Sequence, residues 1–344
     1  MARLFGILTT VVFAIGAAIV TWPQFFRLER TFPVAQIVSL RGVVVGVFAA
    51  VGVVALLIAF ARPLRAFAAS ILTLALVAAG ANALILSARG LGTETLPDAT
   101  DTSLRVMTWN TAGTATDPEI IAETAVAMGA RIVALPETTI ETGEAVAIAM
   151  REKGSPMWAH HETYQYREDY AQWDANSTTL LISPELGDYA VVASASASGS
   201  TNTSVVPSVV AMPVDGDGPI VVAVHAVAPR RDDMTRWRDD LRWVADQCAS
   251  DDVILAGDFN ATVDHMARLG VDGASLGRCT DAAAQTGNGG VGTWSTAWPE
   301  LVGTPIDHIM ATDAWRATGS IVLSSRDSSG SDHRPLIVQL EPIG

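Results

Sequence analysis

The sequence predicts an α+β domain of two β-sheets with outer helices, preceded by three membrane-spanning helices. Three observations favour this architecture in a chain of 344 residues. Residues 1–93 are apolar and carry a net charge of +6, whereas residues 94–344 carry −20. The first part contains three long stretches without a charged side chain. In the second part, short apolar runs alternate with helical or loop segments, which is typical of layered α+β domains.

The N-terminal part contains three uncharged apolar stretches of 19, 19 and 21 residues, at positions 4–22, 42–60 and 66–86. Each is close to the roughly 20 residues that a helix needs to cross a bilayer. We interpret the first as an anchor rather than a signal peptide, because no small-residue cleavage site follows it. The expected organisation is a membrane anchor of three transmembrane helices, a polar tether and a soluble domain, at residues 1–89, 90–103 and 104–344.

The only two cysteines, Cys248 and Cys279, lie in the soluble part. An isolated pair is typical of one disulfide in an oxidising compartment, and two unrelated buried thiols are the alternative. The arginines beside the apolar stretches divide almost evenly between the two sides of the membrane, so they give little indication of orientation. We therefore expect a Cys248–Cys279 bridge in a multi-pass cell-membrane protein with an extracytoplasmic domain.

The apolar runs of the soluble part predict eight strands, at residues 104–109, 131–135, 178–182, 205–212, 220–224, 253–256, 306–311 and 335–340. Residues 118–130 predict a helix with Asp117 as N-cap and Pro118 at its first position. Residues 232–248 predict a second helix, because their apolar side chains recur at helical spacing. Residues 193–204 consist mainly of small side chains and predict a loop.

Six of these strands carry acids, amides or imidazoles at one end, where core packing does not favour them: Asn110, Glu137, His225, Asp258 with Asn260, Asp307, and Asp332 with His333. In "VILAGDFN", Gly257 permits a bend or a close backbone approach. If the chain stays extended, Asp258 and Asn260 point the same way and Phe259 points into the core. Taken alone, the run fits an ordinary turn equally well. The joint pattern predicts a single site where the six ends meet.

The residue types indicate the chemistry of such a site. Carboxylate and amide oxygens favour Mg²⁺, with Mn²⁺ or Ca²⁺ as alternatives, over zinc. A hard cation stabilises charge on a phosphoryl oxygen and lowers the pKa of bound water. Histidine acts as an acid or base near neutral pH, and Asp307 is placed to hold His333 in one tautomer and to stabilise its protonated form. These properties predict metal-assisted hydrolysis of a phosphate ester.

At these residues the sequence resembles the endonuclease/exonuclease/phosphatase superfamily, which includes deoxyribonuclease-like and sphingomyelinase-like enzymes. The elements "TWN", "PE", a strand-end histidine, "GDFN", "IDH" and "SDH" occur in the family's order over about residues 104–340. The resemblance implies a four-layer α/β/β/α sandwich with the site at one end of the paired sheets. It also implies that residues 104–344 form the catalytic domain.

The resemblance further implies that Asn110 and Glu137 bind the metal, with Glu137 as the main carboxylate. Asp332 would be a second ligand at the metal or phosphate site. The family includes members with one metal and with two, so the number of ions stays open.

The remaining roles follow from the same resemblance. Asp258 would orient or activate the attacking water, and Asn260 would hold a phosphate oxygen. His225 would contact the phosphate or assist the leaving group, and Asp307 would orient His333. Family members differ in the residue that acts as base.

Other polar and aromatic residues are weaker candidates. Nucleases of the family place a Tyr or Arg near the phosphate, and residues 163–173 offer Tyr164, Tyr166, Arg167 and Tyr170 without a means of choosing. Trp294 and Trp298 line the site mouth or cap the sandwich. We expect structural or simply exposed positions for His160, His161, His265, His308, Arg230 and Arg231.

The sequence thus predicts a membrane-embedded, metal-dependent phosphoesterase that uses His333 with Asp307, and His225, as acid–base groups. The alternative is a non-catalytic, membrane-tethered binding module on the same fold. The expected substrate is a phosphate ester in a nucleic acid, a nucleotide or a phospholipid headgroup, and no protein partner is predicted. The net charge of −20 and a single lysine, Lys153, disfavour long duplex DNA. Nuclease and lipid phosphodiesterase both stay open.

Overall fold

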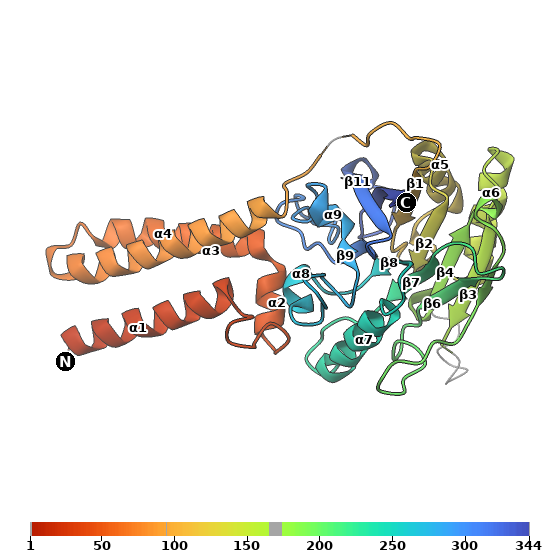
Figure 1. Cartoon of the computed structure of the whole chain (residues 1–344). Coiled ribbons are helices and arrows are strands. Elements are labelled where there is room, and N and C mark those ends of the chain that lie inside the picture. Colours follow the sequence, from red (N-terminus) through yellow and green to blue (C-terminus); the bar gives the residue numbers. More distant parts are fainter. Residues whose placement is uncertain (1, 94, 165–173, 344) are drawn as a thin grey trace. The chain divides into compact units, whose positions relative to one another are not determined.

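The computed structural model describes residues 2–93, 95–164 and 174–343, which form two compact units, Met1–Arg89 and Gly90–Gly344 (Figure 1). The first unit is helical, as predicted. Its elements are α1 (Ala2–Thr21), α2 (Val34–Ser39), α3 (Arg41–Ile58) and α4 (Arg65–Ala88). By length and composition, α1, α3 and α4 are suited to crossing a membrane.

The helices of the first unit are joined by a buried polar network and a small apolar cluster. Arg41 Nη1 donates a hydrogen bond to Asn82 Oδ1 at 2.6 Å, and Asn82 Nδ2 donates to Thr21 Oγ1 at 3.0 Å. The network connects the end of α1, the start of α3 and the last turns of α4. Since buried polar groups are costly unless they are paired, these contacts favour one arrangement of the three helices.

The second unit contains two mixed six-stranded sheets. The first has the order β11 (Trp315–Val322), β12 (Leu336–Pro342), β1 (Leu104–Thr108), β2 (Ile132–Pro136), β4 (Ser177–Ile182) and β3 (Trp158–Thr163). The second has the order β5 (Tyr189–Val191), β6 (Val209–Pro213), β7 (Ile220–His225), β8 (Val253–Asp258), β10 (Asp307–Ala311) and β9 (Thr280–Asp281). Only β1 with β2 and β7 with β8 pair in parallel among these strands.

The two sheets pack face to face around one apolar core. Strand alternation directs Val106 of β1, Ala134 of β2 and Ala256 of β8 into this core. On the outer side of the first sheet lie α5 (Pro118–Met128) and α6 (Ile140–Glu152), and α7 (Met234–Gln247) runs beside β7 and β8 (Figure 1). The predicted α+β sandwich of helix, sheet, sheet and helix layers is therefore confirmed.

All eight predicted strands are present in the structure, as are the two predicted helices. Asp117 caps α5 by accepting a hydrogen bond from the Glu119 backbone N–H at 2.9 Å. The strands that the sequence analysis missed are β3, β5, β9 and β11, and the missed helices include α6. These strands lie at sheet edges, where half-exposed or very short segments lack a continuous apolar run.

The segment expected to act as a tether, residues 90–103, forms hydrogen bonds with the second unit. The Gly92 N–H donates to Gly287 O at 3.0 Å, and Thr93 Oγ1 donates to Ser320 O at 2.7 Å. Further along, Ser103 Oγ donates to Glu341 Oε1 at 2.5 Å. The Gly backbone and the Thr and Ser hydroxyls of this segment therefore form hydrogen bonds with the domain. Composition alone does not distinguish such an attached segment from a mobile linker.

The predicted Cys248–Cys279 disulfide is confirmed. Cys248 follows the last residue of α7 and Cys279 precedes β9, and the two are 31 positions apart in the sequence. Both cysteines are buried. The bridge therefore ties α7 to the edge of the second sheet.

Candidate functional site

Three of the predicted site residues form one row across neighbouring strands of the second sheet. His225 ends β7, Asp258 ends β8 and Asp307 begins β10. In the sheet register, Asp258 is paired with both His225 and Asp307. Strand alternation gives these side chains the same inner face as the core residues below them. The site therefore lies at one end of the core between the sheets.

Gly257 explains the close approach of β7 and β8 beside this row. Its φ is +157°, and a Cβ added here would lie 1.9 Å from the Val224 carbonyl oxygen. A side chain at position 257 would therefore push apart the strands that align His225 with Asp258.

The first sheet supplies Asn110 and Glu137 from the loops that follow the parallel strands β1 and β2. Asn110 Nδ2 donates to Glu137 Oε1 and to Asp258 Oδ2, both at 3.1 Å. Glu137 adopts a left-handed φ of +56°, and its side chain remains 29% exposed. Non-glycine residues in this region are strained and cluster at functional sites. Asn110 thus connects the acids of the two sheets.

His333 enters the site from the segment before β12, which is antiparallel to β1. Three hydrogen bonds fix this segment. Trp109 Nε1 donates to the His333 carbonyl at 2.9 Å, the His333 N–H donates to Ser331 Oγ at 2.9 Å, and Ser331 Oγ donates to the Asn110 carbonyl at 2.6 Å. The backbone around His333 is therefore attached directly to the end of β1.

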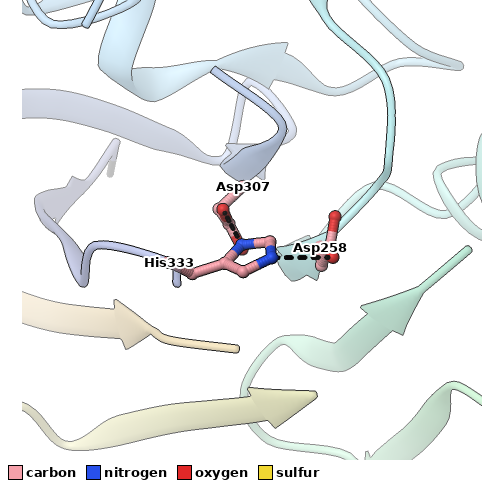
Figure 2. A group of neighbouring side chains, drawn as sticks. All are labelled: Asp258, Asp307 and His333. Atoms are coloured by element: carbon pink, nitrogen blue, oxygen red, sulfur yellow. Dashed lines mark hydrogen bonds and ion pairs between the residues drawn. The ribbon is translucent and has the colours of Figure 1, made fainter. Parts of the chain in front are cut away.

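The His333 ring lies between Asp307 and Asp258 (Figure 2). Its Nδ1 is 2.8 Å from Asp307 Oδ2, and its Nε2 is 3.8 Å from Asp258 Oδ2. All three side chains are buried. Because carboxylates face both ring nitrogens, the arrangement stabilises a doubly protonated imidazolium.

The electrostatics of the group follow from this geometry. Burial lowers the pKa of His333, but the Asp307 carboxylate, assisted by Asp258 and Asp332, outweighs it and raises the pKa to about 10. Burial and the negative charge of Asp307 raise the pKa of Asp258 to about 7. At neutral pH the group therefore contains a protonated histidine beside an acid that readily gains or loses a proton.

His225 has the opposite character. Burial, together with the positive charge of His333, lowers the pKa of His225 to about 3, so its imidazole is neutral at pH 7. Its Nε2 lies 4.0 Å from Glu137 Oε1. Among the described residues, its buried Nδ1 and the buried Oδ1 of Asp307 have no hydrogen-bond partner. Both atoms therefore have unmet hydrogen-bonding capacity within the site.

Asn260 reaches the group through a turn rather than through extended backbone. Its φ is +46°, in the left-handed region, so of the two alternatives for residues 258–260 the structure has the turn. Its N–H donates to Asp258 Oδ1 at 2.8 Å, and its Nδ2 donates to the Ala226 carbonyl at 2.9 Å. Phe259 is fully buried, as predicted. Asparagine tolerates this conformation better than most residues, which favours the turn at this position.

Asp332 lies at the solvent side of the group, with 57% of its side chain exposed. Its Oδ1 is 3.9 Å from His333 Nε2, and its Oδ2 accepts a hydrogen bond from Trp294 Nε1 at 2.9 Å. Of the two alternatives for Trp294, the structure favours a place at the site mouth.

The structure therefore brings all eight predicted site residues into one connected group. Each has a polar atom within 4.0 Å of another member: Asn110, Glu137, His225, Asp258, Asn260, Asp307, Asp332 and His333. The group joins both sheets, and its most exposed members, Glu137 and Asp332, face solvent. A solute can thus reach the outer members of the group, whereas the inner members are buried.

The donor set fits a hard cation. The Glu137 carboxylate is partly exposed, and the buried Asn110 beside it presents an amide oxygen that accepts one hydrogen bond, from the Ala112 N–H at 3.0 Å. Neither cysteine is available as a thiolate, because both are in the disulfide. Within the described part of the chain, Asp258, Asp307 and His333 also have ligand atoms within 4.8 Å of one another. Since His333 is itself a cation in that trio, the Glu137–Asn110 pair is the more suitable place for a metal.

Several residues that support the site were not identified from sequence. The buried Asp240 accepts hydrogen bonds from the Ser204 N–H at 2.7 Å and from the Val227 N–H at 3.0 Å, which fixes the segment after His225. Asp281 pairs with His308 at 2.6 Å. Acids on helices or short edge strands have no distinguishing local pattern, so only the fold identifies them.

The residues expected to be structural have such contacts. His308 Nε2 lies 2.8 Å from the Ala261 carbonyl, and His265 forms a capping box with Thr262. Arg230 and Arg231 are exposed. Of the candidates in residues 163–173, Tyr166, Arg167 and Tyr170 lie outside the described residues.

Comparisons with known proteins agree with this geometry. The model of a family described as "Endonuclease/Exonuclease/phosphatase family" matches residues 107–333 of the chain. No curated protein sequence matches the chain significantly.

Solved structures share the fold at low sequence identity. An endonuclease/exonuclease/phosphatase from Beutenbergia cavernae DSM 12333 is 20% identical with a TM-score of 0.52, covering 71% of this chain and 72% of that one. A D. rerio TDP2 humanized by 14 mutations is 16% identical with a TM-score of 0.52, covering 70% of this chain and all of that one. D. rerio TDP2 complexed with single strand DNA product is 15% identical with a TM-score of 0.51, covering 70% and 100%.

Proposed function

Since the chain belongs to the endonuclease/exonuclease/phosphatase family, we propose that it is a membrane-anchored, metal-dependent phosphoesterase that uses an activated water as nucleophile. The observation that carries the proposal is the single connected group of eight polar residues between the ends of the two sheets. Residues 1–89 would anchor the chain and residues 104–344 would be the catalytic domain.

Glu137 and Asn110 would hold Mg²⁺, with Asp332 as an additional ligand, and Mn²⁺ or Ca²⁺ would suit the same oxygens. The cation would neutralise charge on the phosphoryl group and lower the pKa of water. Asn110 also donates a hydrogen bond to each neighbouring acid, which limits the repulsion between Glu137 and Asp258.

Asp258 would accept a proton during the reaction, and His333 would stabilise negative charge. With its pKa raised to about 7, Asp258 is suited to take a proton from the attacking water near neutral pH. The protonated His333, oriented by Asp307, would oppose the negative charge that develops on the phosphoryl oxygens. Asn260 would hold a phosphate oxygen. The neutral His225 would donate a hydrogen bond to the phosphate, because its lowered pKa does not suit proton delivery.

Two features support a cell-membrane location with the domain outside the cytoplasm. Three helices are apolar and long enough to span a bilayer. The Cys248–Cys279 bridge is typical of oxidising compartments.

The test is hydrolysis of a soluble diester, bis(p-nitrophenyl) phosphate, by the full chain with Mg²⁺ or with a chelator. We expect Mg²⁺-dependent turnover that falls by roughly 10² to 10⁴ in Glu137→Gln and in His333→Ala. Glu144→Gln, at an exposed position on α6, is the matched control and should keep the wild-type rate. Mg²⁺ binding without turnover of any phosphate mono- or diester would favour the alternative, a binding module.

A further inference from the structure

The loop at residues 292–303, called here the rim loop, exposes large apolar side chains beside the site. Trp298 is 59% exposed and Leu301 is 43% exposed, although both follow a tightly packed segment. Trp294 of the same loop contacts the catalytic group, since its Nε1 donates a hydrogen bond to Asp332 Oδ2 at 2.9 Å. Grouped apolar side chains on a surface commonly mark an interaction site.

Buried Arg334 holds the rim loop rigidly. Its Nη1 donates to the Gly292 carbonyl at 3.0 Å and its Nη2 donates to the Trp298 carbonyl at 2.8 Å. Asp327 orients the guanidinium through two hydrogen bonds of 2.7 Å. Because Arg334 directly follows His333, the exposed tryptophan is fixed relative to the catalytic histidine. The backbone carbonyls carry these bonds, so the Trp298 side chain remains free for another contact.

Another exposed apolar residue, Leu91, reaches the same region from the N-terminal side. Leu91 and Glu300 both line a cavity of about 530 Å³, and the Gly292 N–H donates to the Glu300 carbonyl at 2.8 Å. Only two residues of the chain separate Leu91 from Ala88, the last residue of α4. Three residue steps span at most about 11 Å. If α4 crosses a membrane, chain length alone therefore keeps Leu91 close to that membrane.

The charge of the rim loop indicates which partner it suits. Residues 292–304 contain one charged side chain, Glu300, and no lysine or arginine. A polyanion such as nucleic acid needs cations along its path. Tryptophan, in contrast, favours the boundary between lipid headgroups and acyl chains, and the exposed Trp298 and Leu301 suit that boundary.

We propose that the rim loop docks on a zwitterionic bilayer surface through Trp298 and Leu301, and that the substrate is a phospholipid phosphodiester presented at that surface. The proposal rests on the phosphoesterase activity proposed above. The rigid rim loop would seat the catalytic group against the headgroup layer, so that the ester bond enters beside Asp332 while the acyl chains stay in the bilayer.

The docking surface is tested without reference to activity. Since the described cysteines are both in the disulfide, Trp298→Cys or Leu301→Cys gives one free thiol for a spin label. The full chain is placed in phosphatidylcholine vesicles, and Trp158→Cys is the matched control, because Trp158 on β3 is also 59% exposed. We expect collisions with oxygen to exceed those with a water-soluble nickel complex at 298 and 301 but not at 158. Labels at 298 and 301 as accessible to nickel as the label at 158 would overturn the docking surface.

The substrate class is tested with vesicle phosphatidylcholine, soluble bis(p-nitrophenyl) phosphate and single-stranded DNA. We expect Trp298→Ala to lower the ratio of lipid to soluble turnover about tenfold, and Trp158→Ala to leave it unchanged. Hydrolysis of DNA without hydrolysis of vesicle lipid would overturn the lipid assignment. Immersed labels without turnover of any phosphate mono- or diester would support docking and refute the phosphoesterase function, whereas soluble turnover with water-exposed labels would do the reverse.

Discussion

Replacement of Asp307 by asparagine isolates the contribution of the buried aspartate–histidine pair. The Asp307 Oδ2 to His333 Nδ1 distance is 2.8 Å, and this carboxylate is the main group that raises the pKa of His333 to about 10. A hydrogen bond to a charged group contributes about 1.5–3 kcal/mol, which corresponds to roughly one to two pKa units. In Asp307→Asn, the pKa of His333 should therefore fall by at least about one unit.

The assay is the pH dependence of kcat/KM for bis(p-nitrophenyl) phosphate with saturating Mg²⁺. In the wild type, the rate should rise as Asp258 loses its proton near pH 7 and fall as His333 loses its proton near pH 10. In Asp307→Asn, the alkaline fall should move by about one to two pH units toward neutral pH, so that the rate at pH 10 should drop by roughly 5- to 50-fold while the rate at pH 8 changes by no more than about twofold.

Asp281→Asn is the matched control, since Asp281 pairs with His308 at 2.6 Å in an equally buried position outside the catalytic group. This variant should lose stability but keep the alkaline fall of the wild type. An Asp307→Asn enzyme within about threefold of the wild-type rate at pH 10, with its alkaline fall unmoved, would refute the assigned roles.

Three further predictions concern stability, each measured as the thermal midpoint of the full chain in detergent. Replacing Cys248 and Cys279 by alanine should cost about 3–4 kcal/mol for a loop of 31 positions, and the midpoint should then become insensitive to reductant; equal reductant sensitivity in the variant would contradict the bridge. Burial raises the pKa of Asp240 from its ordinary 3.8 to about 6, so the folded protein binds a proton more readily than the unfolded chain. The stability from this group is thus full below about pH 4 and declines by up to about 3 kcal/mol as the pH rises to about 6, and Asp240→Asn should flatten that decline. A wild-type thermal midpoint that rises between about pH 4 and pH 6, with an equal rise in Asp240→Asn, would contradict the predicted direction of the pH dependence. Gly257→Ala should destabilise the chain by about 3 kcal/mol or more because its Cβ would meet the Val224 carbonyl, and a variant as stable as the wild type would show that the strands separate easily.

Much of the site was predictable because its residues follow or precede buried strands. Asn110, Glu137 and Asp258 each come directly after an apolar run, and parallel or register-paired strands deliver such ends to one edge. Polar residues at the ends of six strands together predicted the site, although no single strand end is sufficient to predict it. The fold class followed from the same runs together with the three charge-free stretches.

The features that sequence did not predict depend on tertiary contacts. Edge strands such as β11 alternate with partial exposure and lack a continuous apolar run. The segment at residues 90–93 has the composition of a linker and is ordered only by partners near Gly287 and Ser320. No local sequence pattern identifies the buried Asp240, because its hydrogen-bond donors include the backbone N–H groups of Ser204 and Val227, which lie elsewhere in the chain.

Manganese binding tests the central claim, that Glu137 and Asn110 hold a divalent cation beside the protonated His333. The measurement is a titration of Mn²⁺ into the full chain, followed by the electron paramagnetic resonance signal of the free ion, for the wild type, Glu137→Gln and His333→Gln. We expect one site that Glu137→Gln weakens by at least about tenfold and that His333→Gln retains. Loss of the site in His333→Gln, with full binding in Glu137→Gln, would place the cation among Asp258, Asp307 and His333 and contradict the proposed catalytic roles.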